Sequence, residues 1–165
     1  MRLRPVLLSA LLLAGLPLAG ADVPIHGIQG AGASSPLVGQ SVTTTGVVTA
    51  LRPNGFYLQA PDGEADADPA TSEGVLVFTS SAPPAAAAVG NRVRVSGSVV
   101  EYRPSADPAS PPLTEIGGSV SVALLSSANP LPAPVLLTSA DLSPAGPADP
   151  LGRHAGLRVH LPPPP

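Results

Sequence analysis

The chain has 165 residues, a formal net charge of −3, and neither cysteine nor lysine. Net acidity repels phosphates at long range and excludes generic electrostatic affinity for nucleic acid, while the lack of cysteine excludes disulfides. With 23 prolines, 17 glycines and 12% charged residues, the composition predicts many short strands joined by turns, in an all-β domain.

Residues 1–21 have the pattern of a secretory signal peptide. Arg2 and Arg4 precede an apolar run over 6–18, and Ala-Gly-Ala at 19–21 supplies a cleavage site. The alternative is a membrane anchor, but the run is short for a hydrocarbon core of about 30 Å and ends in small residues. The sequence therefore predicts a secreted protein, extracellular or periplasmic, and cleavage would change the formal charge to −5.

The stretch 38–59 predicts a β-hairpin. Its arms, 41–52 and 56–60, are rich in β-branched and aromatic residues, and the turn Pro53-Asn54-Gly55 supplies the positive φ angles that a tight hairpin needs. Gly46 interrupts the first arm and predicts a bend of the kind that lets a small barrel close. Before the hairpin, residues 22–32 predict an extended first strand that ends in a glycine turn.

Three further strands follow the hairpin. They are predicted at 74–79, 91–103 and 114–125, and Gly97 interrupts the second of them. Between them, residues 85–88 leave room for at most one helical turn, because prolines precede them and a glycine follows. Five antiparallel strands with glycine breaks predict a five-stranded OB-like β-barrel over residues 22–128.

Beyond residue 128 the pattern changes. Residues 129–150 read as a proline-rich linker with extended backbone, part of a proline-rich C-terminal tail. Residues 151–165 regain a strand pattern, and Gly156-Leu-Arg-Val159 repeats the Gly-x-x-Val that begins at Gly39 and Gly90. Coincidence is one explanation. The other is the start of a second, truncated β-unit, since the final strand has no partner visible in the sequence.

Several segments carry a resemblance to a known family. They are IHGIQGAG, SPLVGQSVTTTGVVTALRPNGFYLQ, DPATSEG, VLVFTSSAPP and VGNRVRVSGSVVEY. In this order they resemble the OB-fold domain near the N-terminus of bacterial extracellular nucleases of the endonuclease/exonuclease/phosphatase superfamily, over about residues 25–134. In that family the hydrolytic centre lies in a separate, later domain with metal-binding Asp, Asn, Glu and His residues. The resemblance thus implies a place beside a nuclease and no catalytic residue in this chain.

The acidic loop at 62–73 is a candidate metal site. Its carboxylates fall at relative positions 1, 3, 5, 7 and 12: Asp62, Glu64, Asp66, Asp68 and Glu73. This spacing is typical of a calcium loop and predicts Ca²⁺ as a cofactor, although Ala67 stands where a glycine should make the sharp turn. The alternative is a solvated acidic connection between strands. His26, His154 and His160 are predicted to be surface or turn residues because they are widely separated.

OB barrels bind single strands on the face of their second and third strands, by stacking and nearby cations. The candidate contacts are Arg52, Tyr57, Arg92, Arg94, Tyr102 and Arg103. Phe56 and Phe78 are assigned to the core, whereas Tyr57 is out of phase with Phe56 and faces outward.

The predicted function is that of a non-catalytic accessory module of a secreted nuclease. It would present single-stranded nucleic acid or position a nuclease catalytic domain. The alternative is a structural or protein-interaction barrel without nucleic-acid affinity, which the net acidity and the proline content favour.

Overall fold

A computed structural model describes residues 22–141, 152–161 and 163. The predicted signal peptide and residues 142–150 of the predicted linker lie outside the described residues. Within the described part of the chain, no helix is long and apolar enough to cross a membrane.

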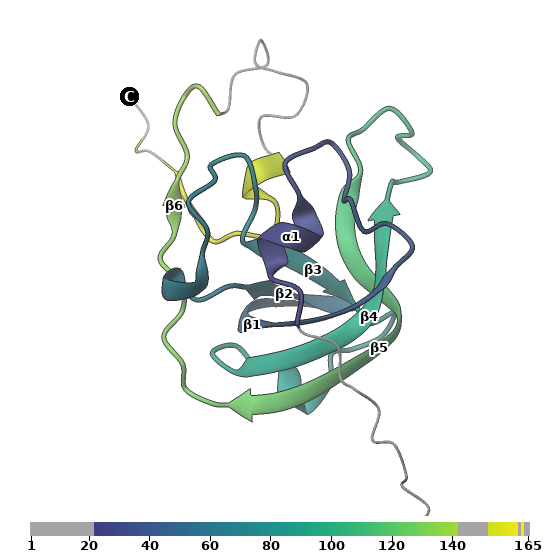
Figure 1. Ribbon diagram of the computed structural model, residues 1–165, viewed down its shortest axis with the longest axis vertical. Helices are drawn as coiled ribbons and strands as arrows, with labels where there is room; N and C mark the ends of the chain where they lie inside the picture. Colours follow the sequence, from purple (N-terminus) through teal and green to yellow (C-terminus); the bar gives the residue numbers. More distant parts are fainter. Residues whose placement is uncertain (1–21, 142–151, 162, 164–165) are drawn as a thin grey trace, which may run out of the picture.

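Five strands form the main sheet. They are β1 (Ser41–Arg52), β2 (Gly55–Gln59), β3 (Gly74–Phe78), β4 (Arg92–Tyr102) and β5 (Leu113–Ser126). They pair in the order β1-β2-β3-β5-β4, and β4 returns to β1, so the sheet closes into a barrel (Figure 1). The all-β prediction is confirmed. The prediction that every strand pair is antiparallel is wrong, because the ring closes through β3 and β5, which run parallel.

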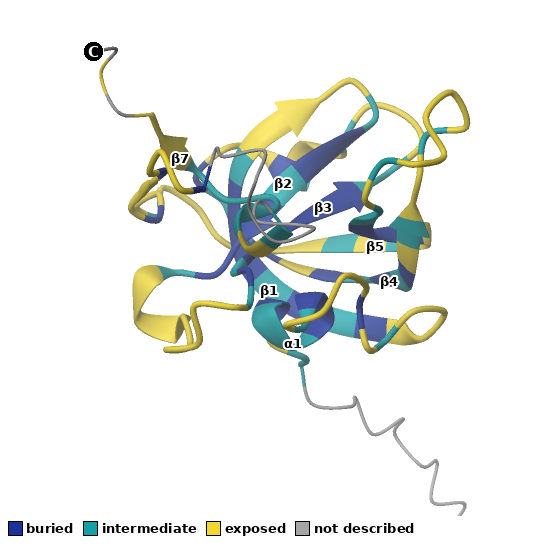
Figure 2. Ribbon diagram, turned by 90° about the horizontal axis from the view of Figure 1, so that it is seen from above, coloured by how far each residue is buried: buried dark blue, intermediate teal, exposed yellow. Residues whose placement is uncertain are grey.

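The barrel interior holds the hydrophobic core. Inward-facing side chains alternate along each strand, and Phe56, Leu58, Val75, Val77 and Ile116 are fully buried. In Figure 2 the buried segments (dark blue) lie mainly on the strands and on α1, and most of the surrounding loops are exposed (yellow). Burying a large apolar side chain contributes about 1.5–3 kcal/mol, so the core supplies the stability that disulfides cannot.

The first strand serves both sides of the barrel. β1 bonds to β4 through its first half and to β2 through its second, and both partners meet it at Val47. A Cβ on Gly46 would lie 2.8 Å from Leu58 Cγ, so glycine permits the close approach of β2. The irregularity of the strand itself falls later, between Val48 and Ala50, where the pairing register shifts.

The segment before the barrel is helical. The prediction of an extended strand is wrong, because α1 spans Ile25–Gln29. Ile25 and Ile28 are both buried in the core. Residues three apart point to opposite faces of a strand but to one face of a helix, so only a helix can bury both. The helix ends at Gly30, whose φ of +68° suits glycine.

The final strand has a partner. β7 (Val159–His160) pairs in parallel with β6 (Val135–Leu136) to form a second, two-stranded sheet. Figure 1 shows the C-terminal segment (yellow) reaching β6 beside the barrel. The prediction of an unpartnered last strand is wrong, because β6 lies inside the stretch that the prolines marked as a linker. Three 3₁₀ turns complete the described elements: Asp62–Glu64, Ala85–Ala87 and Gly152–His154.

Candidate functional site

The outer face of β2 and β3 carries one more aromatic residue than the sequence predicts. Val75 and Val77 belong to the core cluster, so the two-residue period puts Leu76 and Phe78 outside the barrel. Leu76 is buried yet absent from the core cluster, and Phe78 is partly exposed. The assignment of Phe78 to the core is therefore wrong, because the strand continues without a bulge and its alternation holds.

Arg52, Tyr57 and Phe78 surround Gly55 on this face. Gly55 pairs with Arg52 on one side and with Phe78 on the other. Tyr57 is two residues farther along β2, so it is a diagonal neighbour of both, at about 7–8 Å, within reach of aromatic and long side chains. A Cβ at position 55 would meet a β3 carbonyl oxygen at 2.4 Å. The surface between Arg52 and Phe78 therefore stays free of a side chain. We call these three residues the hairpin-end face.

Arg52 supplies a positive charge to the hairpin-end face. It is exposed and forms no hydrogen bond or ion pair with any residue that the structure describes. Leu76 of β3 pairs with Tyr57 on one side and with Glu115 of β5 on the other, so the three residues form one row across the sheet. Burial raises the pKa of Glu115, and the positive charge of Arg52 partly offsets that rise. Apart from this electrostatic attraction to Glu115, the Arg52 guanidinium has no described partner and can contact an anionic ligand.

The other four predicted contacts lie elsewhere. Arg92 and Arg94 are at the start of β4, where they pair with Glu64 at 2.7 Å and Asp22 at 2.5 Å. Tyr102 and Arg103 are at its other end, eight or more residues farther along the chain. The six residues thus do not form one surface but three separate pairs, of which Arg52 and Tyr57 lie on the outer face of the hairpin.

The opposite end of the β2–β3 face is covered by residues 155–158. A Cβ on Gly74 would lie 2.4 Å from the carbonyl carbon of Gly156, so the two backbones are in direct contact. The Ser72 hydroxyl donates to the Ala155 carbonyl at 2.7 Å, and Arg158 N–H donates to the side chain of Gln59. This half of the face is closed by the chain itself.

Asp141 holds Arg153 and His154, which directly precede the covering residues 155–158. Its carboxylate accepts hydrogen bonds from the amide and the hydroxyl of Thr138 at 2.8 and 2.7 Å. It also pairs with Arg153 and lies 3.5 Å from His154 Nε2. The hydrogen bonds from Thr138, followed by that from Arg153, hold the pKa of Asp141 well below its usual range. The carboxylate is therefore ionised at neutral pH and binds the segment.

The carboxylates of the acidic loop do not converge on one point. Asp62 accepts from the Ala133 amide, Glu64 pairs with Arg92, and Asp68 accepts from the Ala70 amide. Asp66 and Glu73 do come together, since the Asp66 amide donates to Glu73 Oε1 at 2.6 Å. Two of the five predicted ligands are therefore neighbours.

His26 joins these two carboxylates. Its Nδ1 lies 3.0 Å from Glu73 Oε1 and 3.7 Å from Asp66 Oδ2. One ligand atom from each of the three lies within 4.8 Å of the others, and no other described residues form such a group of metal-type ligands. The assignment of His26 to an ordinary surface position missed this cluster. His26 is 40 residues from Asp66 and 47 residues from Glu73, too far for a recognisable ligand motif in the sequence. Only the packing of α1 beside β3 brings the three side chains together.

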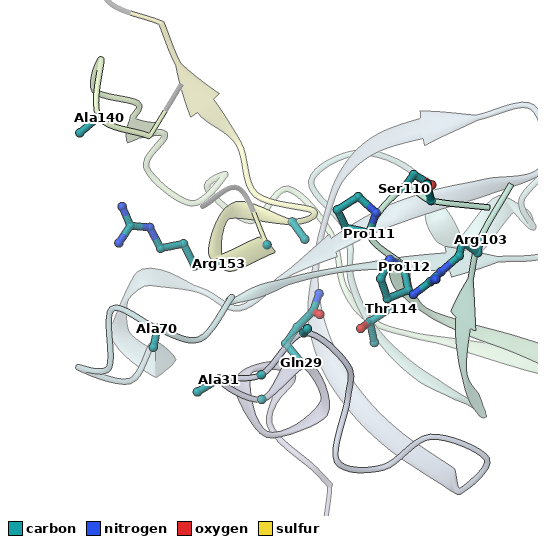
Figure 3. A pocket seen from close by; sticks show the side chains of 16 residues that line it. Gln29, Ala31, Ala70, Arg103, Ser110, Pro111, Pro112, Thr114, Ala140 and Arg153 are labelled. Carbon is teal, nitrogen blue, oxygen red and sulfur yellow. The ribbon is translucent and has the colours of Figure 1, made fainter. Parts of the chain in front are cut away.

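A cavity of about 710 Å³ opens between the end of α1, the loop before β5 and residues 152–155. Figure 3 shows Arg103 beside Pro112 and Thr114, whereas Arg153 extends toward Ala140. Most of the lining is glycine, alanine and proline. Because Arg153 is paired with Asp141, few polar groups are directed at a ligand here, and the cavity does not define a site.

Comparisons with known proteins do not place the chain in a family. No protein-family model matches it, and a search of curated proteins found no significant match.

Proposed function

We propose that this chain is an OB-type barrel that holds single-stranded nucleic acid on the hairpin-end face, as a non-catalytic accessory module of a secreted nuclease. The closed barrel of five strands in the order β1-β2-β3-β5-β4 supports the OB assignment. OB barrels bind their ligands on the face of the second and third strands, which here includes the hairpin-end face. The observation that carries the proposal is the arrangement of Tyr57, Phe78 and the unpaired Arg52 around Gly55.

The chemistry suits a short stretch of single strand. Every base has a π-face, so aromatic stacking holds bases with little sequence preference, at about 1–3 kcal/mol for each base. Two rings accommodate roughly two bases, and Arg52 reaches a phosphate. The affinity of the module alone is weak, because few phosphates are neutralised and the remaining surface is acidic. Such a module would act by holding substrate beside a nuclease domain.

We infer secretion from the signal-peptide pattern of residues 1–21, and the nuclease partner from the family resemblance. Ca²⁺ in the acidic loop stays a prediction, and its titration is one arm of the metal experiment described below.

A fluorescence titration of a labelled single-stranded oligonucleotide tests the proposal. We expect saturable binding that weakens as salt rises, with a shallow slope, because about one phosphate is neutralised. Arg52→Ala should flatten the salt dependence, and a duplex of the same sequence should bind less well because its bases are stacked. The absence of salt-sensitive binding to the single strand would remove the proposal.

A second candidate is docking of a catalytic or other protein domain without nucleic acid. Apolar side chains around the small sheet support it, since Leu136, Val159 and Leu161 are 56%, 43% and 60% exposed. If Leu136→Asp abolishes association with a co-expressed nuclease domain while oligonucleotide binding is absent, this second function replaces the first.

A further inference from the structure

We propose that His26, Asp66 and Glu73 form a binding site for a divalent transition-metal ion of the Zn²⁺ class. The site lies between α1 and the loop that joins β2 to β3. It is independent of the hairpin-end face, so the two proposals succeed or fail separately.

The spacing of the ligand atoms fits a small tetrahedral ion. Metal–ligand bonds of 2.0–2.1 Å in a tetrahedron place neighbouring ligand atoms roughly 3.3 Å apart. His26 Nδ1 lies 3.0 Å from Glu73 Oε1 and 3.7 Å from Asp66 Oδ2, on either side of that value. Small side-chain movements would thus allow all three atoms to bind one ion, with a fourth position left for water.

The donor set favours a transition metal over calcium. Ca²⁺ takes six to eight oxygen ligands, whereas Zn²⁺ accepts an imidazole nitrogen together with carboxylate oxygens. The other acidic side chains of this loop are engaged with Ala133, Arg92 and Ala70, so they do not complete an oxygen shell. One imidazole and two carboxylates remain.

The second oxygen of the Glu73 carboxylate is a separate reason to expect a cation at this side chain. Glu73 Oε2 is buried and accepts no hydrogen bond from any described residue. Glu73 also lines a cavity of about 190 Å³ together with Thr44, which is completely buried and whose Oγ1 is likewise unpaired among the described residues. A buried carboxylate oxygen without a partner is costly, and a cation bound through Oε1 would lower that cost by neutralising the charge of the same carboxylate.

The ligands are held in place before any ion binds. The Thr71 hydroxyl and the Asp68 amide donate to Asp66 at 3.1 and 2.9 Å, and the Asp66 amide donates to Glu73. His26 is carried by α1, whose isoleucines are anchored in the core. An ion here would join the N-terminal helix to the β2–β3 loop, which gives the site a structural role.

The test is a metal titration of chelator-treated protein, followed by calorimetry and thermal unfolding. We expect one equivalent of Zn²⁺ to bind and, at a hundredfold excess over Kd, to raise Tm by about 5–10 °C. Ca²⁺ at the same concentration should leave Tm unchanged. His26→Gln and Glu73→Gln should each abolish the Zn²⁺-dependent rise, whereas Asp68→Asn, which removes one charge from the same loop, should retain it.

A spectroscopic measurement keeps the test decisive if a variant folds poorly. Co²⁺ added to the unaltered protein should give the visible absorption of a tetrahedral nitrogen–oxygen site, and Zn²⁺ should displace it. The proposal is overturned if Zn²⁺ does not bind, or if His26→Gln binds Zn²⁺ as tightly as the unaltered protein. It is also overturned if Ca²⁺ raises Tm more than Zn²⁺ and His26→Gln retains that rise, which would instead support the calcium prediction.

Discussion

The two ends of the outer β2–β3 face differ in what lies above their glycines. At one end, Gly55 is itself buried and lies between Arg52, which is exposed, and Tyr57 and Phe78, which are partly exposed. At the other, Gly74 is in backbone contact with Gly156. The C-terminal segment thus covers one part of the outer β2–β3 face, whereas the aromatic part of that face stays partly exposed.

The largest expected effect comes from filling the covered end. Gly74→Val would place carbon atoms within 2.4 Å of the Gly156 backbone, so the C-terminal segment must move away. We expect a loss of about 3 kcal/mol in the free energy of unfolding, because backbone cannot yield as a flexible side chain does. Urea unfolding measures the loss, and limited proteolysis should show earlier cleavage near residue 156.

Gly63→Ala is the matched control, because a Cβ there meets nothing within 4 Å and its φ is ordinary. If Gly74→Val and Gly63→Ala have equal stability, the covered end is not packed as described.

The next largest effect is a loss of oligonucleotide binding on substitution in the hairpin-end face. Tyr57→Ala should weaken binding of a single-stranded oligonucleotide about tenfold, in line with the loss of one stacked base. Tyr102→Ala removes a tyrosine that is 50% exposed and lies outside the hairpin-end face, so it should leave the Kd unchanged. Equal losses for the two variants in the same titration would contradict a binding face confined to the hairpin end.

A smaller effect should appear at Asp141 as a function of pH. The pKa of Asp141 is lowered in the folded state by Thr138 and Arg153, so its stabilising contribution is complete above the unfolded value near 3.9. That contribution is lost as pH falls from about 4 toward the folded value. Asp141→Asn should therefore lower Tm at pH 7 and match the unaltered protein in strong acid. A constant difference at all pH values would contradict the ionic role.

The smallest effect is a gain in stability, and it comes from Glu115, which lies in the same row of the sheet as Tyr57. Burial raises the pKa of Glu115 above 4.5, so its charged form destabilises the folded state at neutral pH. Glu115→Gln should raise Tm slightly at pH 7, and the gain should disappear as pH falls through the folded pKa to below 4.5. Thermal unfolding between pH 7 and pH 4 measures the gain in Tm and its loss in acid. A lower Tm for Glu115→Gln at pH 7 would show that the charge of Glu115 is stabilising.

The hairpin, the order of the five strands along the chain and the single turn at 85–87 could be predicted because local rules determine them. Asn-Gly specifies the turn, and β-branched alternation specifies the strands. Gly97 lies at the register shift between Ser96 and Ser98 in β4, as an interrupting glycine predicts. Tyr57 is outside because its neighbours are inside, and the same parity applied to β3 could have placed Phe78 correctly.

Three features could not be predicted from the sequence, because they depend on contacts between segments that are far apart in the chain: the helix α1, the β6–β7 sheet and the cluster at His26. α1 is too short for a periodic signal, and its helical form follows from the burial of Ile25 and Ile28 against the barrel. The pairing of β6 with β7 joins two-residue strands across more than twenty residues. The cluster at His26 likewise needs α1 to pack beside β3, so no local spacing could predict it.

An NMR titration with a short single-stranded oligonucleotide locates the bound strand on the surface of the protein. We predict that the amide shifts that change on titration cluster at Arg52, Tyr57 and Phe78, with those of Gly74 and Gly156 unaffected. Changes centred on Arg92 and Arg94, or no changes at all, would contradict the account.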